Sequence, residues 1–145
     1  MGLNTLLLDV GNTRVKWRLL VDDVVSEGAA DHRGEVPQIV AALPKMPVAR
    51  VALAQVLGAK PGEALVKALA ARYRCLPQQA LVKSEALGLT VAYRQPERLG
   101  VDRWLAMLAA RRHGPGQAVV VAMAGTALTL DVVTAEGRHL GGLIA

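Results

Sequence analysis

A strand-like run that ends in an acid, a glycine and a hydroxyl residue, and then returns as a second strand, constrains this chain more than any other feature. The apolar residues from Leu6 to Leu8 lead directly into the stretch from Asp9 to Thr13. The next segment, from Val15 to Leu20, alternates apolar and basic residues, as a half-buried strand does. The pattern predicts a corner between the two strands of a hairpin. A Walker loop differs, because it opens a helix and ends in Gly-Lys-Ser or Gly-Lys-Thr.

This first corner has the residue types that hold a nucleotide phosphate. Asp9 can orient a Mg²⁺-bound water, and Gly11 lets the backbone approach a phosphate. Asn12 and Thr13 supply short hydrogen-bond donors. An ordinary tight turn uses the same residue types, so the first corner alone leaves both interpretations open.

A second corner of the same kind lies near the end of the chain. The apolar run from Val119 to Ala122 is followed, after two more residues, by the stretch from Gly125 to Ala127. The returning run, from Leu128 to Val133, carries an acid, Asp131. Two such corners on separate lobes are what a clamp needs to hold a triphosphate from both sides.

A third stretch, from Tyr93 to Trp104, lies between the corners. Pro96 suits the first turn of a short helix, and Gly100 ends it. Asp102 then stands at the start of a helical run, where an Asp is a good N-cap. The same carboxylate can accept a proton from a substrate hydroxyl, with Arg103 beside it for an anion. Spacing alone does not separate these two roles.

Together the three stretches resemble the type III pantothenate kinases, a family that also contains the Bvg accessory factors. The resemblance extends from Leu6 to Ala145 and corresponds to the N-terminal portion of the family. It implies an α/β protein with an actin-like, ribonuclease-H-like ATPase fold: a mixed sheet with flanking helices, comprising a first lobe and the start of a second. It also implies ATP-dependent phosphorylation of pantothenate, the first step of coenzyme A biosynthesis. Members are homodimers that use Mg²⁺ and a monovalent cation, K⁺ or NH₄⁺.

The resemblance also implies roles by position. Asp102 is the general base toward the pantothenate hydroxyl, and Asp9 holds the metal. The residues implied to bind ATP and its phosphates are Asp9, Gly11, Asn12, Thr13, Lys16, Gly125, Thr126 and Thr129. Those implied to line the pantothenate pocket are Tyr93, Gly100, Val101 and Arg103.

The chain departs from the family pattern in three respects. Met123 stands where the family has an acid before the second corner, and hard cations prefer oxygen to a thioether. Val91 and Ala92 stand where the family often has an Asn. The family's chains are also longer, so we expect a fragment of a longer protein that is inactive by itself. Two alternatives stay open: a non-catalytic relative that binds a nucleotide or partner, and a kinase for another small hydroxylated substrate.

Composition fits a compact protein with an aliphatic core, since 52% of residues are hydrophobic and only 3% aromatic. The longest apolar runs, such as Ala118 to Ala124, are too short to span a bilayer, and no leader precedes the first strand, so we expect a cytoplasmic protein without a membrane partner. The net charge is +5, but the arginines are dispersed, so no nucleic-acid partner is expected. Cys75 is the only cysteine and permits no internal disulfide.

Several further residues are expected to be structural. Trp17 and Trp104 are predicted to be packing anchors, and the spacing of His32, His113 and His139 does not suit a zinc site. Gly141 and Gly142 predict a bend or a close backbone approach on a strand.

Hydrophobic periodicity predicts the order of the elements. The break from His113 to Gly116 is predicted to separate a first lobe, residues 1–114, from the start of a second, residues 117–145. Leu105, Leu108 and Ala109 are predicted to face inward. Strands are predicted over Leu6 to Asp9, Val15 to Val21, Asp23 to Gly28, Ala49 to Val56 and Cys75 to Leu81, and helices over Val36 to Leu43, Pro61 to Tyr73 and Arg103 to His113.

Overall fold

The structure is a computed structural model that describes residues 3–145. Two compact units make up the chain, residues 1–80 and residues 81–145. Both corners predicted from the sequence are present, and they lie in different units: the first corner in unit 1 and the second in unit 2.

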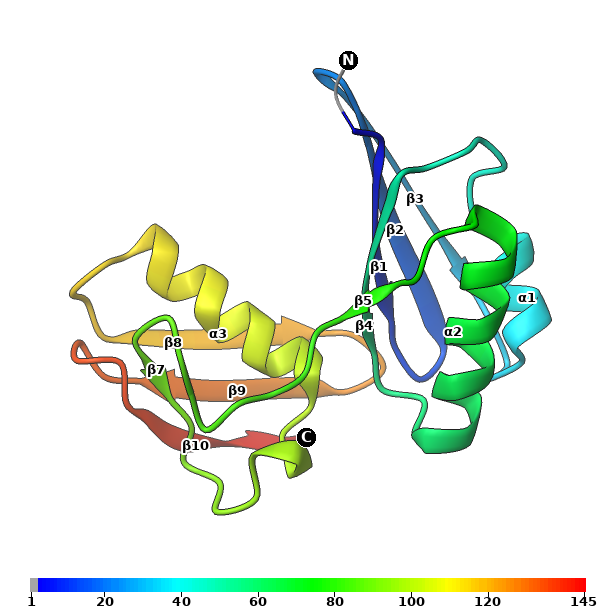
Figure 1. Cartoon of the computed structure of the whole chain (residues 1–145). Coiled ribbons are helices and arrows are strands. Elements are labelled where there is room, and N and C mark those ends of the chain that lie inside the picture. Colours follow the sequence, from blue (N-terminus) through cyan, green and yellow to red (C-terminus); the bar gives the residue numbers. More distant parts are fainter. Residues whose placement is uncertain (1–2) are drawn as a thin grey trace. The chain divides into compact units, whose positions relative to one another are not determined.

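Unit 1 is a mixed five-stranded sheet whose strand order is β3-β2-β1-β4-β5. Strand β1 pairs antiparallel with β2 and parallel with β4. Helices α1 and α2 lie together on one face of the sheet (Figure 1). The bounds are β1 Thr5–Val10, β2 Arg14–Val21, β3 Val24–Asp31, α1 Val36–Ala41, β4 Arg50–Gln55, α2 Ala59–Tyr73 and β5 Gln78–Gln79. The strand predicted from Cys75 to Leu81 is much shorter in the structure, where only β5 is present. The predicted mixed sheet with flanking helices is confirmed.

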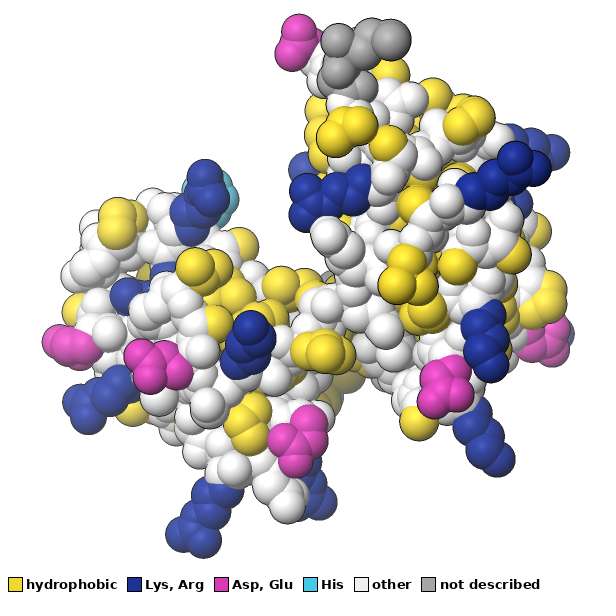
Figure 2. Space-filling model, viewed as in Figure 1, with side chains coloured by type: hydrophobic (Ala, Val, Ile, Leu, Met, Phe, Trp, Pro, Cys, Tyr) yellow, Lys and Arg dark blue, Asp and Glu magenta, His cyan; other side chains and the backbone are white. Residues whose placement is uncertain are grey.

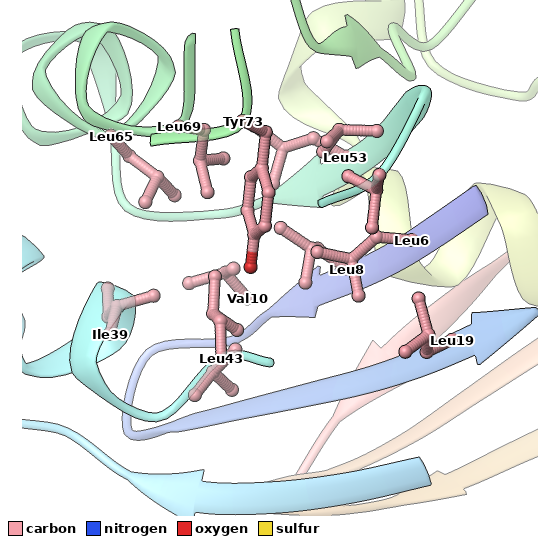
Figure 3. Close-up of a cluster of buried hydrophobic side chains, with 13 residues drawn as sticks. Leu6, Leu8, Val10, Leu19, Ile39, Leu43, Leu53, Leu65, Leu69 and Tyr73 are labelled. Carbon is pink, nitrogen blue, oxygen red and sulfur yellow. The ribbon is translucent and has the colours of Figure 1, made fainter. Parts of the chain in front are cut away.

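The core of unit 1 lies between the sheet and its two helices. Alternation along β1 buries Leu6, Leu8 and Val10, because successive side chains of a strand point to opposite faces. Figure 3 shows these side chains pointing toward Ile39 of α1 and Leu65 of α2. The open face of β1 is thereby left to Leu7 and Asp9, which places Asp9 on the face that the helices do not cover.

Trp17 packs on the core side of this sheet as an anchor. It pairs with Gly28 across β2 and β3. A Cβ atom on Gly28 would lie 2.5 Å from the indole Cζ2, so the ring covers the space that a side chain would take. The predicted packing role of Trp17 is confirmed.

Unit 2 is a three-stranded antiparallel sheet, in the order β10-β9-β8, with α3 across one face (Figure 1). A short hairpin of β6 and β7 and a 3₁₀ helix, η1, precede α3. The bounds are β6 Glu85–Ala86, β7 Leu89–Thr90, η1 Pro96–Arg98, α3 Val101–His113, β8 Val119–Ala124, β9 Leu128–Val133 and β10 His139–Ile144. The predicted irregularity at Gly141 is confirmed, because the register of β10 shifts between His139 and Gly141.

The buried face of α3 differs from the prediction. Trp104 and Met107 are buried, whereas Leu105 is 36% exposed and Ala109 is also exposed. Both sets of residues recur at helical spacing, so periodicity alone could not choose between them. The larger side chains, led by the indole of Trp104, take the face toward the sheet, and the predicted packing role of Trp104 is confirmed.

The division between the units also differs from the predicted lobe boundary. Helix α3 contacts β8 and β9, so it belongs with the strands that follow it. The division falls between Ala80 and Leu81 instead of at the break from His113 to Gly116. Among the described residues, no helix is both long enough and apolar enough to cross a bilayer.

Candidate functional site

The first corner is a tight hairpin turn between β1 and β2. The N–H of Gly11 donates to the carbonyl oxygen of Arg14 at 2.9 Å, which closes the turn. Asn12 and Thr13 form the exposed tip. The turn therefore uses the Gly11 N–H itself and presents the side chains of the next two residues outward.

A buried histidine from the end of β3 holds this corner. His32 is 4% exposed, and its Nε2 lies 3.1 Å from the carbonyl oxygen of Gly11. The N–H of Gly34 donates to Nδ1 at 3.0 Å, so the ring hydrogen is on Nε2 and is donated to Gly11. The backbone N–H of His32 also donates to the carbonyl oxygen of Thr13. The spacing of His32 in the sequence did not indicate that its ring would hold the first corner.

Asp9 and Lys16 lie directly opposite each other on β1 and β2. Residues paired in this way share a face of the sheet. Asp9 is half-buried and Lys16 is exposed. The structure thus brings together the predicted metal ligand, the predicted phosphate-binding lysine and the corner within unit 1.

The second corner closes in a similar way between β8 and β9. The N–H of Gly125 donates to the carbonyl oxygen of Ala127 at 3.0 Å, and Gly125 and Thr126 are exposed. Thr129 pairs with Met123 across the two strands. The hydroxyl oxygen of Thr129 is buried and has no hydrogen-bond partner within residues 3–145.

Asp102 lies two positions further into α3 than predicted, because the helix begins at Val101 instead of Arg103. The N-cap is Gly100, and no side chain caps the helix, so the predicted capping role of Asp102 is wrong. Its Oδ1 accepts the N–H of Arg103 at 2.8 Å within the first turn. A Cβ atom on Gly100 would lie 2.6 Å from Oδ1, so the glycine leaves room for the carboxylate. The half-buried Asp102 is thus held at the start of α3 without serving as its cap.

Arg103 forms a buried ion pair with Asp131 of β9. The carboxylate accepts hydrogen bonds from Nε at 2.7 Å and from Nη2 at 2.6 Å, and both side chains are almost fully buried. His139 of β10 lies 2.8 Å from the same carboxylate. The sequence predicted Arg103 as a substrate contact. It gave no sign that Asp131 holds the guanidinium or that His139 in turn binds Asp131.

The electrostatics of this cluster favour its charged form. Burial by itself would raise the pKa of Asp131, but the hydrogen bonds from Arg103 and His139 outweigh burial and hold that pKa below its ordinary value. The hydrogen bond to Asp131 raises the pKa of Arg103, against the opposing effect of burial. The ion pair is therefore fully formed at neutral pH.

An open pocket of about 310 Å³ lies at the start of the third stretch. Its lining residues are Tyr93, Arg94, Gln95 and Arg98. Two arginines give it a positive charge, which suits an anionic ligand. Tyr93 was predicted from the sequence, whereas Arg94 and Arg98 were not, because isolated arginines carry no pattern.

Acidic and other metal-binding side chains are sparse around these features. Among the described residues, no three His, Cys, Asp or Glu side chains gather as a group that could hold a metal ion.

Comparison with known proteins gives a consistent result. The sequence profile described as type III pantothenate kinase matches residues 5–145. A type III pantothenate kinase of Chromobacterium violaceum is 41% identical over 140 residues, and the match covers 96% of this chain and 56% of that protein. One of Nitrosococcus oceani is 37% identical over 147 residues, covering 96% of this chain and 55% of that protein. The chain therefore spans about half the length of the curated relatives it matches.

Among solved structures, a protein of Sinorhizobium meliloti assigned as a 2-dehydro-3-deoxygalactonokinase has a TM-score of 0.50 and 16% sequence identity. The match covers 97% of this chain and 52% of that one. At this identity the likeness concerns the fold alone, and it agrees with the predicted actin-like, ribonuclease-H-like class.

Proposed function

This chain belongs to the type III pantothenate kinase family, and from that premise we propose that the protein transfers a phosphoryl group from ATP to the hydroxyl of pantothenate. This reaction is the first step of coenzyme A biosynthesis. The observation that carries the proposal is the family match over residues 5–145, which contains both corners and the stretch with Asp102.

Asp102 is the general base in this proposal. The pantothenate oxygen attacks the γ-phosphorus, the bond from that phosphorus to the ADP oxygen breaks, and the hydroxyl proton passes to Asp102. A half-buried carboxylate with room beside Gly100 suits this role. Transfer of this kind depends mainly on positioning and on electrostatic stabilisation of the phosphate oxygens.

The two corners supply the contacts to ATP. Asp9, Gly11, Asn12, Thr13 and Lys16 serve at the first corner. Lys16 adds a positive charge on the same sheet face as Asp9. At the second corner Gly125, Thr126 and Thr129 serve, and the unpartnered buried hydroxyl of Thr129 supports this assignment.

Mg²⁺ fits the residues of the first corner. The ion keeps several waters and needs only one or two carboxylates in addition to the substrate phosphates, so Asp9 is a sufficient protein ligand. When bound, Mg²⁺ neutralises charge on the phosphates during transfer.

A monovalent cation, K⁺ or NH₄⁺, does not fit the residues of the second corner. Met123 offers a thioether there, and the carboxylate of Asp131 is occupied by Arg103 and His139. A hard cation prefers oxygen ligands. No step of the reaction is assigned to this ion.

The pocket at Tyr93 supports pantothenate as the acceptor. Pantothenate carries a carboxylate, and Arg94 and Arg98 give this pocket two positive charges. The remaining predicted contacts, Gly100, Val101 and Arg103, come from the start of α3. Their use by pantothenate is part of the proposal.

The proposal extends to the setting of the enzyme. We place the reaction in the cytoplasm, in a homodimer that has no nucleic-acid or membrane partner. Figure 2 shows Lys and Arg side chains spread over the visible face of each unit, which suits attraction of ATP better than a continuous nucleic-acid surface. Light scattering of the purified whole protein tests the dimer.

Met123 favours one alternative, a relative that binds a nucleotide or partner without turnover. A kinase for another small hydroxylated substrate is the other, and the positive pocket argues for an acidic acceptor.

The whole protein should be incubated with Mg²⁺-ATP and pantothenate, and phosphopantothenate should be measured by mass. Formation of that product supports the kinase. ATP binding without product would favour the non-catalytic relative.

A further inference from the structure

His139 is buried in unit 2 and uses both of its ring nitrogens. The backbone N–H of Ala92 donates to Nδ1 at 3.3 Å, which makes Nδ1 an acceptor. The ring hydrogen therefore lies on Nε2, which is 2.8 Å from Oδ1 of Asp131 and donates to it. Only 4% of His139 is exposed. The ring is thus oriented from both sides and closed to solvent.

Two predicted substrate contacts meet at this histidine. The ring of Tyr93 stands edge-on to the imidazole, with centroids 6.0 Å apart and an angle of 88° between the planes. Arg103 is reached through Asp131, whose carboxylate is shared between Arg103 and His139. His139 therefore links an aromatic side chain that lines the pocket to a buried guanidinium on α3.

The close fit around this cluster indicates that its geometry is fixed. Gly142 pairs with Asp131, and a Cβ atom there would collide with Oδ1 of Asp131 and lie 2.6 Å from Nη2 of Arg103. The hydrogen bond from Ala92 also ties the segment that carries Tyr93 to β10. His139 is therefore in contact with the ring of Tyr93 and with the carboxylate that holds Arg103.

We propose that His139 is a positioning residue for the acceptor substrate, which holds Tyr93 and Arg103 in a fixed relation and does not itself touch the reacting atoms. The proposal rests on the proposed kinase function, because that function makes Tyr93 and Arg103 contacts to pantothenate. A purely architectural histidine would instead affect the stability of the fold and leave the affinity for each substrate unchanged.

The test compares KM for pantothenate with KM for ATP in the whole protein. His139→Leu removes both hydrogen bonds and is expected to raise KM for pantothenate about tenfold, equivalent to about 1.4 kcal/mol. KM for ATP is expected to change less than about twofold, because the lost contacts serve only the acceptor. Met107→Ala is the matched control, since it opens the buried face of α3 and Met107 makes none of the hydrogen bonds of the network. It should lower stability and leave both KM values unchanged.

A second pair of variants tests the positioning role of His139 if His139→Leu does not fold. His139→Gln retains one donor and one acceptor at a similar reach, whereas His139→Asn has the same groups on a shorter side chain. The Gln variant should keep KM for pantothenate close to that of the unaltered protein, and the Asn variant should raise it. Equal KM values for pantothenate in the two variants would overturn the positioning role.

The outcomes separate this proposal from the function on which it rests. An unaltered protein that does not phosphorylate pantothenate rejects both. An active unaltered protein, with KM for pantothenate unchanged in His139→Leu or with both KM values raised equally, rejects only the positioning role. An active protein with a selective rise in KM for pantothenate supports both.

Discussion

The imidazole of His32 donates its Nε2 hydrogen to the carbonyl oxygen of Gly11 across 3.1 Å. These residues lie 21 positions apart in the chain, and the bond fastens the first corner to the end of β3. This side-chain hydrogen bond adds to the backbone hydrogen bonds of the hairpin and to the one from the N–H of His32 to the carbonyl oxygen of Thr13. The corner is therefore preorganised by His32, which binds it on the side away from the exposed tip.

Replacing His32 by leucine should loosen the first corner. The variant leaves the Gly11 carbonyl and the Gly34 N–H without their partners, at an expected cost of about 1–3 kcal/mol of folding free energy. Urea unfolding of the whole protein measures this cost. KM for ATP should rise while KM for pantothenate stays constant. Ile39→Val, a core change in the same unit, should reduce stability without that rise. An unchanged KM for ATP in His32→Leu would show that the hydrogen bond from His32 to Gly11 has no part in nucleotide binding.

Asp102→Asn should reduce kcat by about 10²–10⁴-fold, the usual contribution of a general base. The amide keeps the size of the side chain, so substrate affinity should change little. Steady-state rates of phosphopantothenate formation provide the measurement. Glu97→Gln, an exposed carboxylate on η1, is the matched control and should retain full activity. If Asp102→Asn turned over at the unaltered rate, another group would have to take the proton.

Gly142→Ala should destabilise the protein by about 1–3 kcal/mol through overpacking. The added methyl group would meet the carbonyl oxygen of Leu130 and the carboxylate of Asp131, which is held by Arg103 and His139. Thermal unfolding of the whole protein provides the measurement. Gly114→Ala is the control, because its nearest neighbour would be a side-chain oxygen at 3.5 Å. Equal melting temperatures for the two variants would contradict the close fit described at β10.

The ion pair of Arg103 and Asp131 should make stability depend on pH in the acid range. The folded state lowers the pKa of Asp131, so its contribution is fully present above the unfolded pKa of about 3.9. That contribution is lost as the pH falls through the lower folded pKa. Asp131→Asn leaves a buried guanidinium uncompensated and should cost about 3–5 kcal/mol at pH 7.

Urea unfolding of both proteins between neutral and strongly acid pH tests this dependence. The stability gap between the unaltered protein and Asp131→Asn should be constant near neutrality and narrow once the medium is more acid than the unfolded pKa. A gap that widened on acidification would mean that the folded pKa of Asp131 is raised instead of lowered.

Local sequence patterns were enough to predict β1, β2 and β4 and both corners. Alternation placed β1, β2 and β4 to within one residue at each end, because each strand buries one face. The corners were visible because in each a Gly and a Thr follow an apolar run after two intervening residues. These features depend on neighbours in the chain, which a sequence displays.

The remaining features depend on residues that are distant in the chain. Arg103 and Asp131 are 28 positions apart, and Ala92 and His139 are 47 apart, so no spacing rule could pair them. The same limit explains the wrong face of α3, since two overlapping sets of apolar residues fit a helical period. Only the packed sheet selects Trp104 over Leu105.

The two tryptophans give each unit its own optical signal. Trp17 lies against Gly28 in unit 1, and Trp104 is buried on α3 in unit 2. Each single Trp→Phe variant would leave one emitting indole, in unit 2 for Trp17→Phe and in unit 1 for Trp104→Phe. Fluorescence during denaturation could then follow each half separately and reveal whether they melt in one step or in two.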